Sequence, residues 1–327
     1  MPTPIRAAVL GTGHGHSLGK ARVLRDSADW ELVGVCEPNP EARARRRADP
    51  NWSWVEWKTA AELLEDPTIR MIAAEGEVWE LLEEGEQIIR AGKHLHLDKP
   101  AGTDLPRFRR LLDEARRSSL LLQMGYMFRY NGGFDLLRRL IAEGWLGDIH
   151  AYHCSMNSDI GAASRRNLAF HPGGMMLELP CHVLDILVLL AGRPERVTPF
   201  LRHDGPHDDT LADNTLAVIE FARGRAIVEC SALEVNAFPR RSFQVMGSHG
   251  TFVLQPLEPP VVRLALREPR GEFQAGWQDV EVPNHPRYVR DLEEFAACIR
   301  GEREFPYTAE HDYTVQETVL RACGVLS

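Results

Sequence analysis

The chain has 327 residues, a length that suits two domains of ordinary size. Its apolar fraction of 44% and charged fraction of 26% are typical of a globular protein. A formal net charge of −9 argues against a nucleic-acid-binding surface, which needs a basic face. No apolar run approaches the ~20 residues that cross a bilayer. We therefore expect a globular protein that binds neither nucleic acid nor membrane.

The start of the chain and its cysteines indicate the cellular compartment. The first residues lead directly into a predicted strand, without the basic and apolar regions of a signal peptide. Six cysteines are scattered along the chain, and no two have the spacing of a CxxC motif. This pattern predicts reduced, structural thiols in a cytoplasmic protein.

A glycine-rich turn follows the first predicted strand, Ile5–Leu10, and precedes a predicted helix from about Leu18 to Asp26. Strand, glycine turn and helix is the context of a dinucleotide-binding fingerprint, in which the diphosphate meets the positive helix N-terminus. The third glycine of the fingerprint is replaced by His16, so the motif is imperfect. The predicted cofactor-binding residues of the turn are Gly11, Thr12, Gly13, His14, Gly15 and His16.

The second predicted strand, Glu31–Cys36, ends at Glu37. A carboxylate at this position can accept hydrogen bonds from the ribose hydroxyls of NAD and repels the 2′-phosphate of NADP. Glu37 therefore favours NAD over NADP. The alternative interpretation is a solvated charge at the end of a strand.

Further strand and helix segments alternate up to about residue 122. Ile69–Ala74 and His94–Leu97 are predicted strands, with a helix from about Val78 to Ala91 between them. Alternating strands and helices predict a doubly wound parallel sheet, here a Rossmann domain over residues 1–122. The strand at His94–Leu97 ends in Asp98-Lys99-Pro100, which sets an acid and an ammonium beside a rigid turn. Lys99 is the residue that we expect to be catalytic.

Residues 123–327 have a different pattern, in which strand-like runs dominate and several are joined by glycine-containing turns. This predicts an α+β domain with a large, mostly antiparallel open sheet. One predicted helix, from about Gly174 to Ala191, interrupts the strands, and two more close the chain. The predicted strands are Ile149–Met156, Arg196–Arg202, Thr215–Phe221, Ala226–Val235, Ser242–Met246, Thr251–Leu254 and Val261–Leu266.

The interrupting helix carries Glu178, His182 and Asp185 at positions i, i+4 and i+7, on one face. A carboxylate beside an imidazole can fix its tautomer and make it an oriented general base. An accidental polar stripe on a surface helix is the alternative. His171, Glu178 and His182 are also possible zinc ligands, but their spacing matches no usual zinc signature, so no metal is predicted.

With these segments in view, the chain resembles the Gfo/Idh/MocA family of NAD(P)-dependent oxidoreductases. The resemblance rests on four stretches, in order and over nearly the full length. They are the glycine turn with Glu37, Asp98-Lys99-Pro100 (similar to Glu-Lys-Pro), Gly125–Asn131, and Gly173-Gly174 followed by Glu178, His182 and Asp185.

The resemblance implies hydride transfer between NAD, or NADP, and a hydroxyl-bearing carbon of a sugar, inositol or related polyol. It places Lys99 and Asp98 by the cofactor, His182 as the proton acceptor or donor, and Glu178 where the family usually has Asp. It also implies a homodimer or homotetramer formed through the outer face of the second domain's sheet. Candidate substrate residues are Arg129, Asn157, Asp159, Arg165, Arg166 and His171.

The chain also departs from the family's pattern. Asp98 is one methylene shorter than the usual Glu, and Gly76-Glu77-Val78 stands where Thr-Pro-Asn is common. Glu75 and Glu77 bring negative charge toward the expected diphosphate, and Pro180 lies in the catalytic helix. The altered loop leaves open a catalytically silent regulator that binds cofactor or sugar. The resemblance also implies, as an alternative, NAD-assisted lyase or glycosidase chemistry without net redox change.

Overall fold

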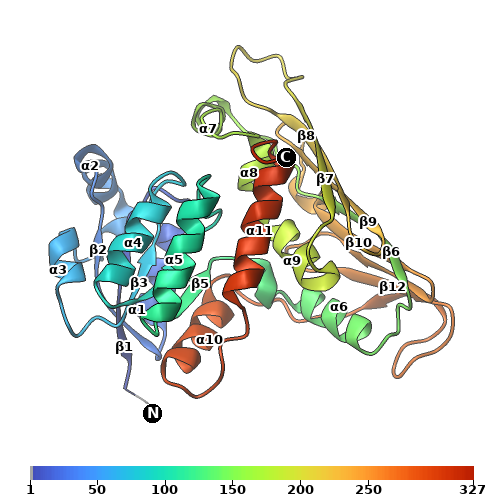
Figure 1. Ribbon diagram of the computed structural model, residues 1–327, viewed down its shortest axis with the longest axis horizontal. Helices are drawn as coiled ribbons and strands as arrows, with labels where there is room; N and C mark the ends of the chain where they lie inside the picture. Colours follow the sequence, from blue (N-terminus) through green and yellow to red (C-terminus); the bar gives the residue numbers. More distant parts are fainter. Residues whose placement is uncertain (1–2) are drawn as a thin grey trace. The chain divides into compact units, whose positions relative to one another are not determined.

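A computed structural model describes residues 3–327 (Figure 1). The chain forms two compact units. The first comprises residues up to Met127 together with Pro286–Tyr313, and the second comprises Phe128–His285 and Thr314–Ser327.

The first unit is built on a five-stranded parallel sheet with the strand order β2-β1-β3-β4-β5. Strands β1, β3 and β5 are short and almost wholly buried, as expected where helices cover both faces of a parallel sheet. This confirms the predicted doubly wound arrangement. The strands are β1 (Ile5–Leu10), β2 (Trp30–Cys36), β3 (Met71–Ala74), β4 (His94–Leu97) and β5 (Leu122–Met124).

Local capping explains where several helices of this unit begin. Thr59 and Glu62 form a capping box at the start of α3, and the side chains of Asn39 and Asp104 accept backbone N–H groups at the starts of α2 and α5. The helices are α1 (Ser17–Asp26), α2 (Pro40–Ala48), α3 (Ala60–Leu64), α4 (Leu81–Arg90), α5 (Leu105–Arg117) and α10 (Val289–Ile299).

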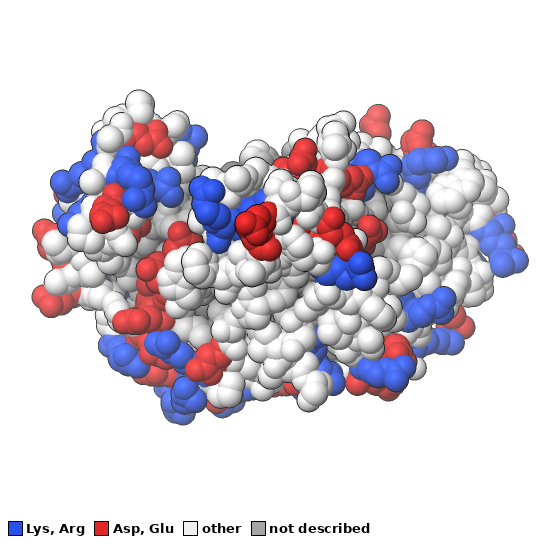
Figure 2. Space-filling model, turned by 90° about the horizontal axis from the view of Figure 1, so that it is seen from above, with Lys and Arg blue, Asp and Glu red and all other residues white. Residues whose placement is uncertain are grey.

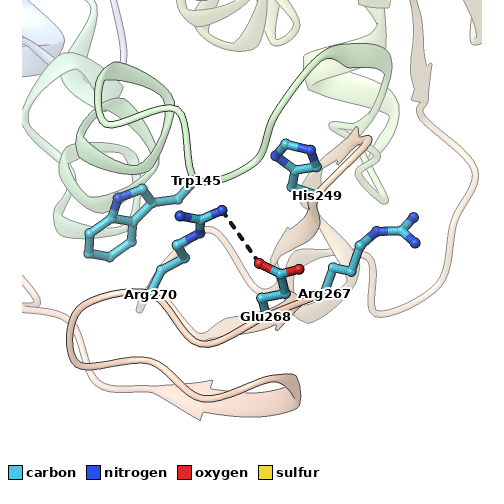
Figure 3. A pocket seen from close by; sticks show the side chains of 5 residues that line it. All are labelled: Trp145, His249, Arg267, Glu268 and Arg270. Atoms are coloured by element: carbon cyan, nitrogen blue, oxygen red, sulfur yellow. Dashed lines mark ion pairs between the residues drawn. The ribbon is translucent and has the colours of Figure 1, made fainter.

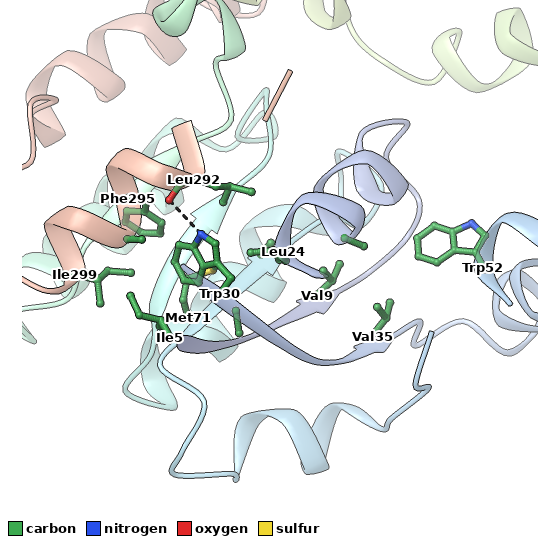
Figure 4. Close-up of a cluster of buried hydrophobic side chains, with 14 residues drawn as sticks. Ile5, Val9, Leu24, Trp30, Val35, Trp52, Met71, Leu292, Phe295 and Ile299 are labelled. Atoms are coloured by element: carbon green, nitrogen blue, oxygen red, sulfur yellow. Dashed lines mark hydrogen bonds between the residues drawn. The ribbon is translucent and has the colours of Figure 1, made fainter. Parts of the chain in front are cut away.

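Helix α10 packs into the core of the first unit although it lies far along the chain. Its Leu292, Phe295 and Ile299 join the buried cluster around Trp30, whose indole N–H donates to the carbonyl of Leu292 at 3.2 Å (Figure 4). The sequence predicts a domain boundary at residue 122, but in the structure the later segment Pro286–Tyr313 also belongs to the first unit. Sequence periodicity cannot show that a distant segment packs against an earlier core.

The second unit contains an eight-stranded sheet with the order β13-β12-β11-β10-β6-β9-β8-β7. Neighbouring strands are antiparallel except for the parallel pair β6 and β9, so the predicted mostly antiparallel sheet is confirmed. The strands are β6 (Ile149–Ser155), β7 (Arg196–Arg202), β8 (Asn214–Glu220), β9 (Arg225–Ser231), β10 (Ser242–Gly247), β11 (Gly250–Leu254), β12 (Val262–Leu266) and β13 (Gly276–Val280), the last of which was not predicted.

Helices cover one face of this sheet (Figure 1). The predicted single helix from Gly174 to Ala191 is wrong, because Pro180 divides it into α8 (Met175–Glu178) and α9 (Cys181–Ala191). Proline has no N–H to donate and its ring crowds the preceding turn, so a continuous helix cannot run through it. The remaining helices are α6 (Gly132–Ala142), α7 (Ala162–Leu168) and α11 (Ala309–Ala322), which begins in the first unit.

The surface carries charge of both signs. On the face that Figure 2 shows, Lys and Arg side chains are interspersed with Asp and Glu side chains.

In the second unit, a small pocket is lined by Trp145, His249, Arg267, Glu268 and Arg270, and Arg270 and Glu268 pair there at 3.8 Å (Figure 3). Within residues 3–327, no helix combines the length and apolarity needed to span a membrane.

Candidate functional site

The glycine turn joins β1 to α1, and its glycines are required by close approaches of the chain. Gly11 has a φ of +82°, and a Cβ there would lie 2.3 Å from the nitrogen of Gly76. At Gly13 a Cβ would lie 2.7 Å from Cγ of Glu77. The absent side chains of these two residues therefore make room for the loop that follows β3. At Gly15 a Cβ would meet nothing within 4 Å, so this side of the turn is open.

The N-terminus of α1 is suited to an anion. His16 occupies the N-cap without a capping hydrogen bond from its side chain, and the first turn contains no acidic residue. The open side at Gly15 and the uncapped helix end fit the diphosphate of a dinucleotide, which binds backbone N–H groups at such a turn. The residues of the turn and the start of α1 would hold that diphosphate.

Glu37 lies where the sequence predicts it, at the end of β2, but it is 5% exposed and faces the turn. One carboxylate oxygen accepts the backbone N–H of Thr12 at 2.9 Å and the Thr12 hydroxyl, and the other accepts the N–H of Asn39 at 2.9 Å. Arg46 donates to the carbonyl of Thr12 at 2.6 Å. A carboxylate has about four acceptor sites, so Glu37 retains capacity for a ribose hydroxyl beside these bonds.

Asp98, at the end of β4, connects the glycine turn to Lys99. Its Oδ1 accepts the backbone N–H of Lys99 at 2.7 Å. Its Oδ2 lies 2.8 Å from Nδ1 of His14, 3.1 Å from Nδ1 of His16 and 3.2 Å from Nζ of Lys20. The Asp98 side chain is fully buried, so all of these contacts are made out of solvent.

Lys20 balances the two buried acids of this cluster. Its ammonium lies 2.6 Å from Glu75 and 3.2 Å from Asp98, and all three side chains are fully buried. Burial alone would lower the pKa of Lys20, but the two carboxylates outweigh it and raise that pKa. Burial and the neighbouring Asp98 raise the pKa of Glu75 well above its usual range. The negative charge that Glu75 was expected to bring toward the diphosphate is therefore neutralised inside the protein.

The histidines of the turn differ from ordinary surface histidines. Burial lowers the pKa of His16 to about 4, although Asp98 opposes the shift. Burial alone would raise the pKa of Asp98, but His14, Lys20 and His16 together hold it well below its usual range. Asp98 is thus an ionised acceptor at neutral pH, which suits a carboxylate that receives several donors.

Donor atoms of His14, His16 and Asp98 also lie within 4.8 Å of one another, a spacing that a metal ion can use. The Lys20 ammonium is 3.2 Å from the same carboxylate oxygen, and its positive charge would repel a cation bound there. We therefore interpret the cluster as a charge network that contains its own cation.

Lys99 is 1% exposed and is the residue that follows Asp98 in the chain. The short β4 and the bond from its backbone N–H to Asp98 fix where its side chain begins. A buried ammonium beside a reacting oxygen can stabilise developing negative charge.

In the second unit His182 lies in the first turn of α9 and is 2% exposed. Its ring packs on Phe128, with the ring centroids 5.3 Å apart. Glu178 ends α8 and is half-buried, so the interruption at Pro180 separates it from the helix that carries His182. Glu178, His182 and Asp185 therefore do not share one helix as predicted: Glu178 lies on α8, and the other two lie on α9.

Asp185 has a buried cationic partner in Arg129. It lies on α9 but receives the guanidinium of Arg129, with contacts of 2.6 to 3.1 Å, and both side chains are fully buried. Arg129, a candidate substrate residue, is thus held inside the unit by Asp185. Its buried position is that of a structural ion pair.

The other candidate substrate residues are placed separately within the second unit. Arg165 is 1% exposed and pairs with Asp209 at 2.7 Å and Asp213 at 2.8 Å. Asn157 is 5% exposed and accepts the backbone N–H of Ser231 at 2.7 Å. His171 is half-buried just before Gly173-Gly174, and Arg166 is exposed on α7.

Three residues of the turn's surroundings were missed by the sequence analysis. Lys20 lies one helical turn after His16, a spacing that could have indicated it. Glu84 lies against Gly11 and accepts the N–H of Gly76 at 3.0 Å. Tyr288 has a φ of +65°, unusual for a residue with a side chain, and its ring lies 5.3 Å from that of His16. No sequence signal placed Tyr288 beside the turn.

Comparisons with known proteins identify the family of this chain. Residues 5–126 match the family described as an oxidoreductase family with an NAD-binding Rossmann fold, and residues 134–253 match the GFO/IDH/MocA C-terminal domain. The chain belongs to the Gfo/Idh/MocA family. The resemblance inferred from the sequence is therefore confirmed.

Relatives of this Gfo/Idh/MocA protein extend over most of its length. It is 25% identical to scyllo-inositol 2-dehydrogenase (NAD(+)) of Bacillus subtilis (strain 168), over 96% of this chain and 92% of that protein. It is also 25% identical to scyllo-inositol 2-dehydrogenase (NADP(+)) of the same organism, over 76% and 68%. A solved structure of UDP-N-acetylglucosamine 3-dehydrogenase from Acidithiobacillus ferrooxidans has a TM-score of 0.80 at 17% identity, covering 99% and 98% of the two chains.

The protein is thus an NAD(P)-dependent oxidoreductase with an N-terminal NAD-binding domain. When bound, the nicotinamide accepts or gives the hydride. The residues of the glycine turn and the start of α1 would hold the dinucleotide.

Proposed function

We propose that this protein is a dehydrogenase that oxidises a CH–OH group of a sugar, inositol or related polyol to the corresponding carbonyl, or reduces that carbonyl. The observation that carries the proposal is the joining of the glycine turn to Lys99 through buried Asp98. This connection places an ammonium in the same unit as the cofactor-binding turn. The NAD(P)-dependent inositol dehydrogenases among the relatives support the substrate class.

The residue roles follow from the chemistry of the reaction. Oxidation of the alcohol moves a hydride to the nicotinamide and leaves one proton, which must go to a base. His182 takes this proton, because imidazole is basic near neutral pH, and returns it in the reverse direction. Lys99 stabilises negative charge on the reacting oxygen. Glu178 supports the proton transfer.

We propose NAD as the preferred cofactor, with NADP as the second. The support is the Glu37 carboxylate at the end of β2, where negative charge opposes a 2′-phosphate. Arg46, which would favour the phosphate, already donates to the carbonyl of Thr12.

The test is oxidation of a panel of inositols and sugars with NAD or NADP, followed by the absorbance of the reduced cofactor. We expect reduced NAD with at least one polyol, and for Lys99→Ala and His182→Ala we expect turnover to slow by about a hundredfold or more. Exposed His150, replaced by alanine, is the matched control. Unimpaired turnover by the Lys99 variant would contradict the assigned roles.

The same panel separates the two other functions. A glycoside that is cleaved in the presence of NAD without accumulation of NADH would indicate redox-assisted lyase or glycosidase chemistry. Cofactor binding without turnover of any substrate would indicate a regulator.

We also propose that the protein is a homodimer or homotetramer. The support is the face of the eight-stranded sheet that carries exposed Phe200 and Trp277 together with half-buried Leu216, Val218 and Ile227. An apolar sheet face of this kind is typical of an association surface.

A further inference from the structure

We propose that His14 and His16 are positioning residues that link occupancy of the glycine turn to the placement of Lys99, through the carboxylate of Asp98. The inference rests on the proposed function for Lys99 and extends it. It assigns to the turn's two histidines a task that dinucleotide binding does not require.

The first support is that the Asp98 carboxylate bridges Lys99 and both histidines of the turn. Oδ1 accepts the backbone N–H of Lys99 at 2.7 Å and also lies 3.2 Å from Nδ1 of His16. Oδ2 lies 2.8 Å from Nδ1 of His14 and 3.1 Å from Nδ1 of His16. One rigid carboxylate therefore joins the turn to the first atom of Lys99. A displacement of either imidazole moves or releases the group that fixes Lys99.

The second support is that the carboxylate cannot adjust by moving into solvent. The Asp98 side chain is fully buried, and the side chains of His14 and His16 are only 5% and 14% exposed. Gly125 closes the other side, since a Cβ there would lie 2.9 Å from Oδ1 of Asp98 and 3.0 Å from Nζ of Lys20. Because packed interiors deform little, a displacement of a histidine ring also displaces the Asp98 carboxylate that it contacts.

The third support is the position of the histidines within the turn. His16 is the N-cap residue of α1, next to the open Gly15 where a diphosphate fits. Its backbone N–H also contacts Nδ1 of His14 at 3.3 Å, and the two rings pack with their centroids 4.4 Å apart. An anion that orders this turn orders both imidazoles together.

These contacts also give a reason for two departures from the common pattern. A glycine in place of His16 would leave Oδ2 of Asp98 without one of its donors. Glutamate in place of Asp98 adds a methylene to a carboxylate that already contacts His14, His16, Lys20 and Lys99. The two substitutions therefore suit each other.

The test uses ADP-ribose, which carries the diphosphate and both riboses of NAD but lacks the nicotinamide ring. The chain has only four lysines, Lys20, Lys58, Lys93 and Lys99. Protein with isotope-labelled lysine therefore gives four side-chain NMR signals, and Lys99→Arg identifies that of Lys99. We expect ADP-ribose to shift the Lys99 signal in the wild type, and no such shift in a His14→Ala/His16→Ala double variant that still binds ADP-ribose by calorimetry.

Kinetics give a second readout that a purely structural role would not produce. At saturating NAD the double alanine variant should turn over at least about tenfold more slowly than the wild type. In protein that already carries Lys99→Ala, the two histidine replacements should cause no further loss of turnover. A His14→Asn/His16→Asn variant, whose amides can donate to Asp98, should recover part of the loss. His150→Ala is the control with an exposed histidine.

Two outcomes would overturn the linkage: ADP-ribose binds to the wild type without shifting Lys99, or the histidine and Lys99 losses multiply independently. A wild type in which ADP-ribose shifts Lys99 but no polyol is oxidised would instead contradict only the proposed function. If the alanine variant does not fold, Asp98→Asn replaces it, because this change preserves the shape of the side chain and removes its charge.

Discussion

Glu84 is a buried carboxyl that lies against the glycine turn. Burial is the main reason that its pKa is raised to about 8, despite the hydrogen bond from Gly76. The folded state therefore holds this proton more tightly than the unfolded chain, whose ordinary value is 4.5. The contribution of Glu84 to stability is complete below pH 4.5 and is lost as the pH rises through about 8.

We expect Glu84→Gln to be as stable as the wild type near pH 4.5 and increasingly more stable above it. The difference should reach about 3 kcal/mol at pH 7, since one pKa unit corresponds to about 1.36 kcal/mol. Urea unfolding at several pH values measures it, and Glu83→Gln, at an exposed neighbouring position, is the control. A constant difference across this range would show that Glu84 does not titrate as described.

The Arg129–Asp185 pair gives a second prediction. Removal of one member leaves a buried charge without its counter-ion, so Asp185→Asn should destabilise the protein by about 3 to 5 kcal/mol. Glu220→Gln, which breaks the exposed pair with Arg196, should cost less than about 1 kcal/mol. Equal losses in thermal denaturation would contradict the assignment of Arg129 as a structural residue.

At the scale of elements, α10 shows how a distant segment completes the first unit. Phe295 is fully buried in the cluster with Trp30 and Leu292. We expect Phe295→Ala to destabilise the protein by about 3 to 5 kcal/mol, as for other large core truncations, and exposed Glu293→Ala to have little effect. Hydrogen exchange should show the loss of protection in β1 and β2 as well as in α10. Loss confined to α10 would contradict the shared core.

At the scale of the whole molecule, the outer sheet face decides the proposed association. Phe200 and Trp277 are 53% and 55% exposed in the single chain. We expect Phe200→Asp/Trp277→Asp to convert an oligomer into a monomer in sedimentation experiments, whereas Phe170→Asp, at another exposed position, leaves it unchanged. A wild type that sediments as a monomer at all concentrations would contradict the proposed oligomer.

The sequence predicted well those features that depend on local pattern. The glycine turn between β1 and α1 and the turn after β4 at Lys99 were located because short strands and turn residues follow one another along the chain. Seven of the eight strands in the second sheet were likewise found from their apolar runs. The apolar periodicity continues on both sides of Pro180 and therefore predicts one long helix where the structure has α8 and α9.

The sequence by itself determined the family, the fold class and the residue types from which the chemistry is proposed. Only the tertiary structure decided their partners: Asp98 with His14, His16 and Lys20, Asp185 with Arg129, and α10 with the first core. These contacts join residues that are distant in sequence. Periodicity reports which face of an element is buried, whereas the identity of a buried charge's partner depends on which elements pack against each other.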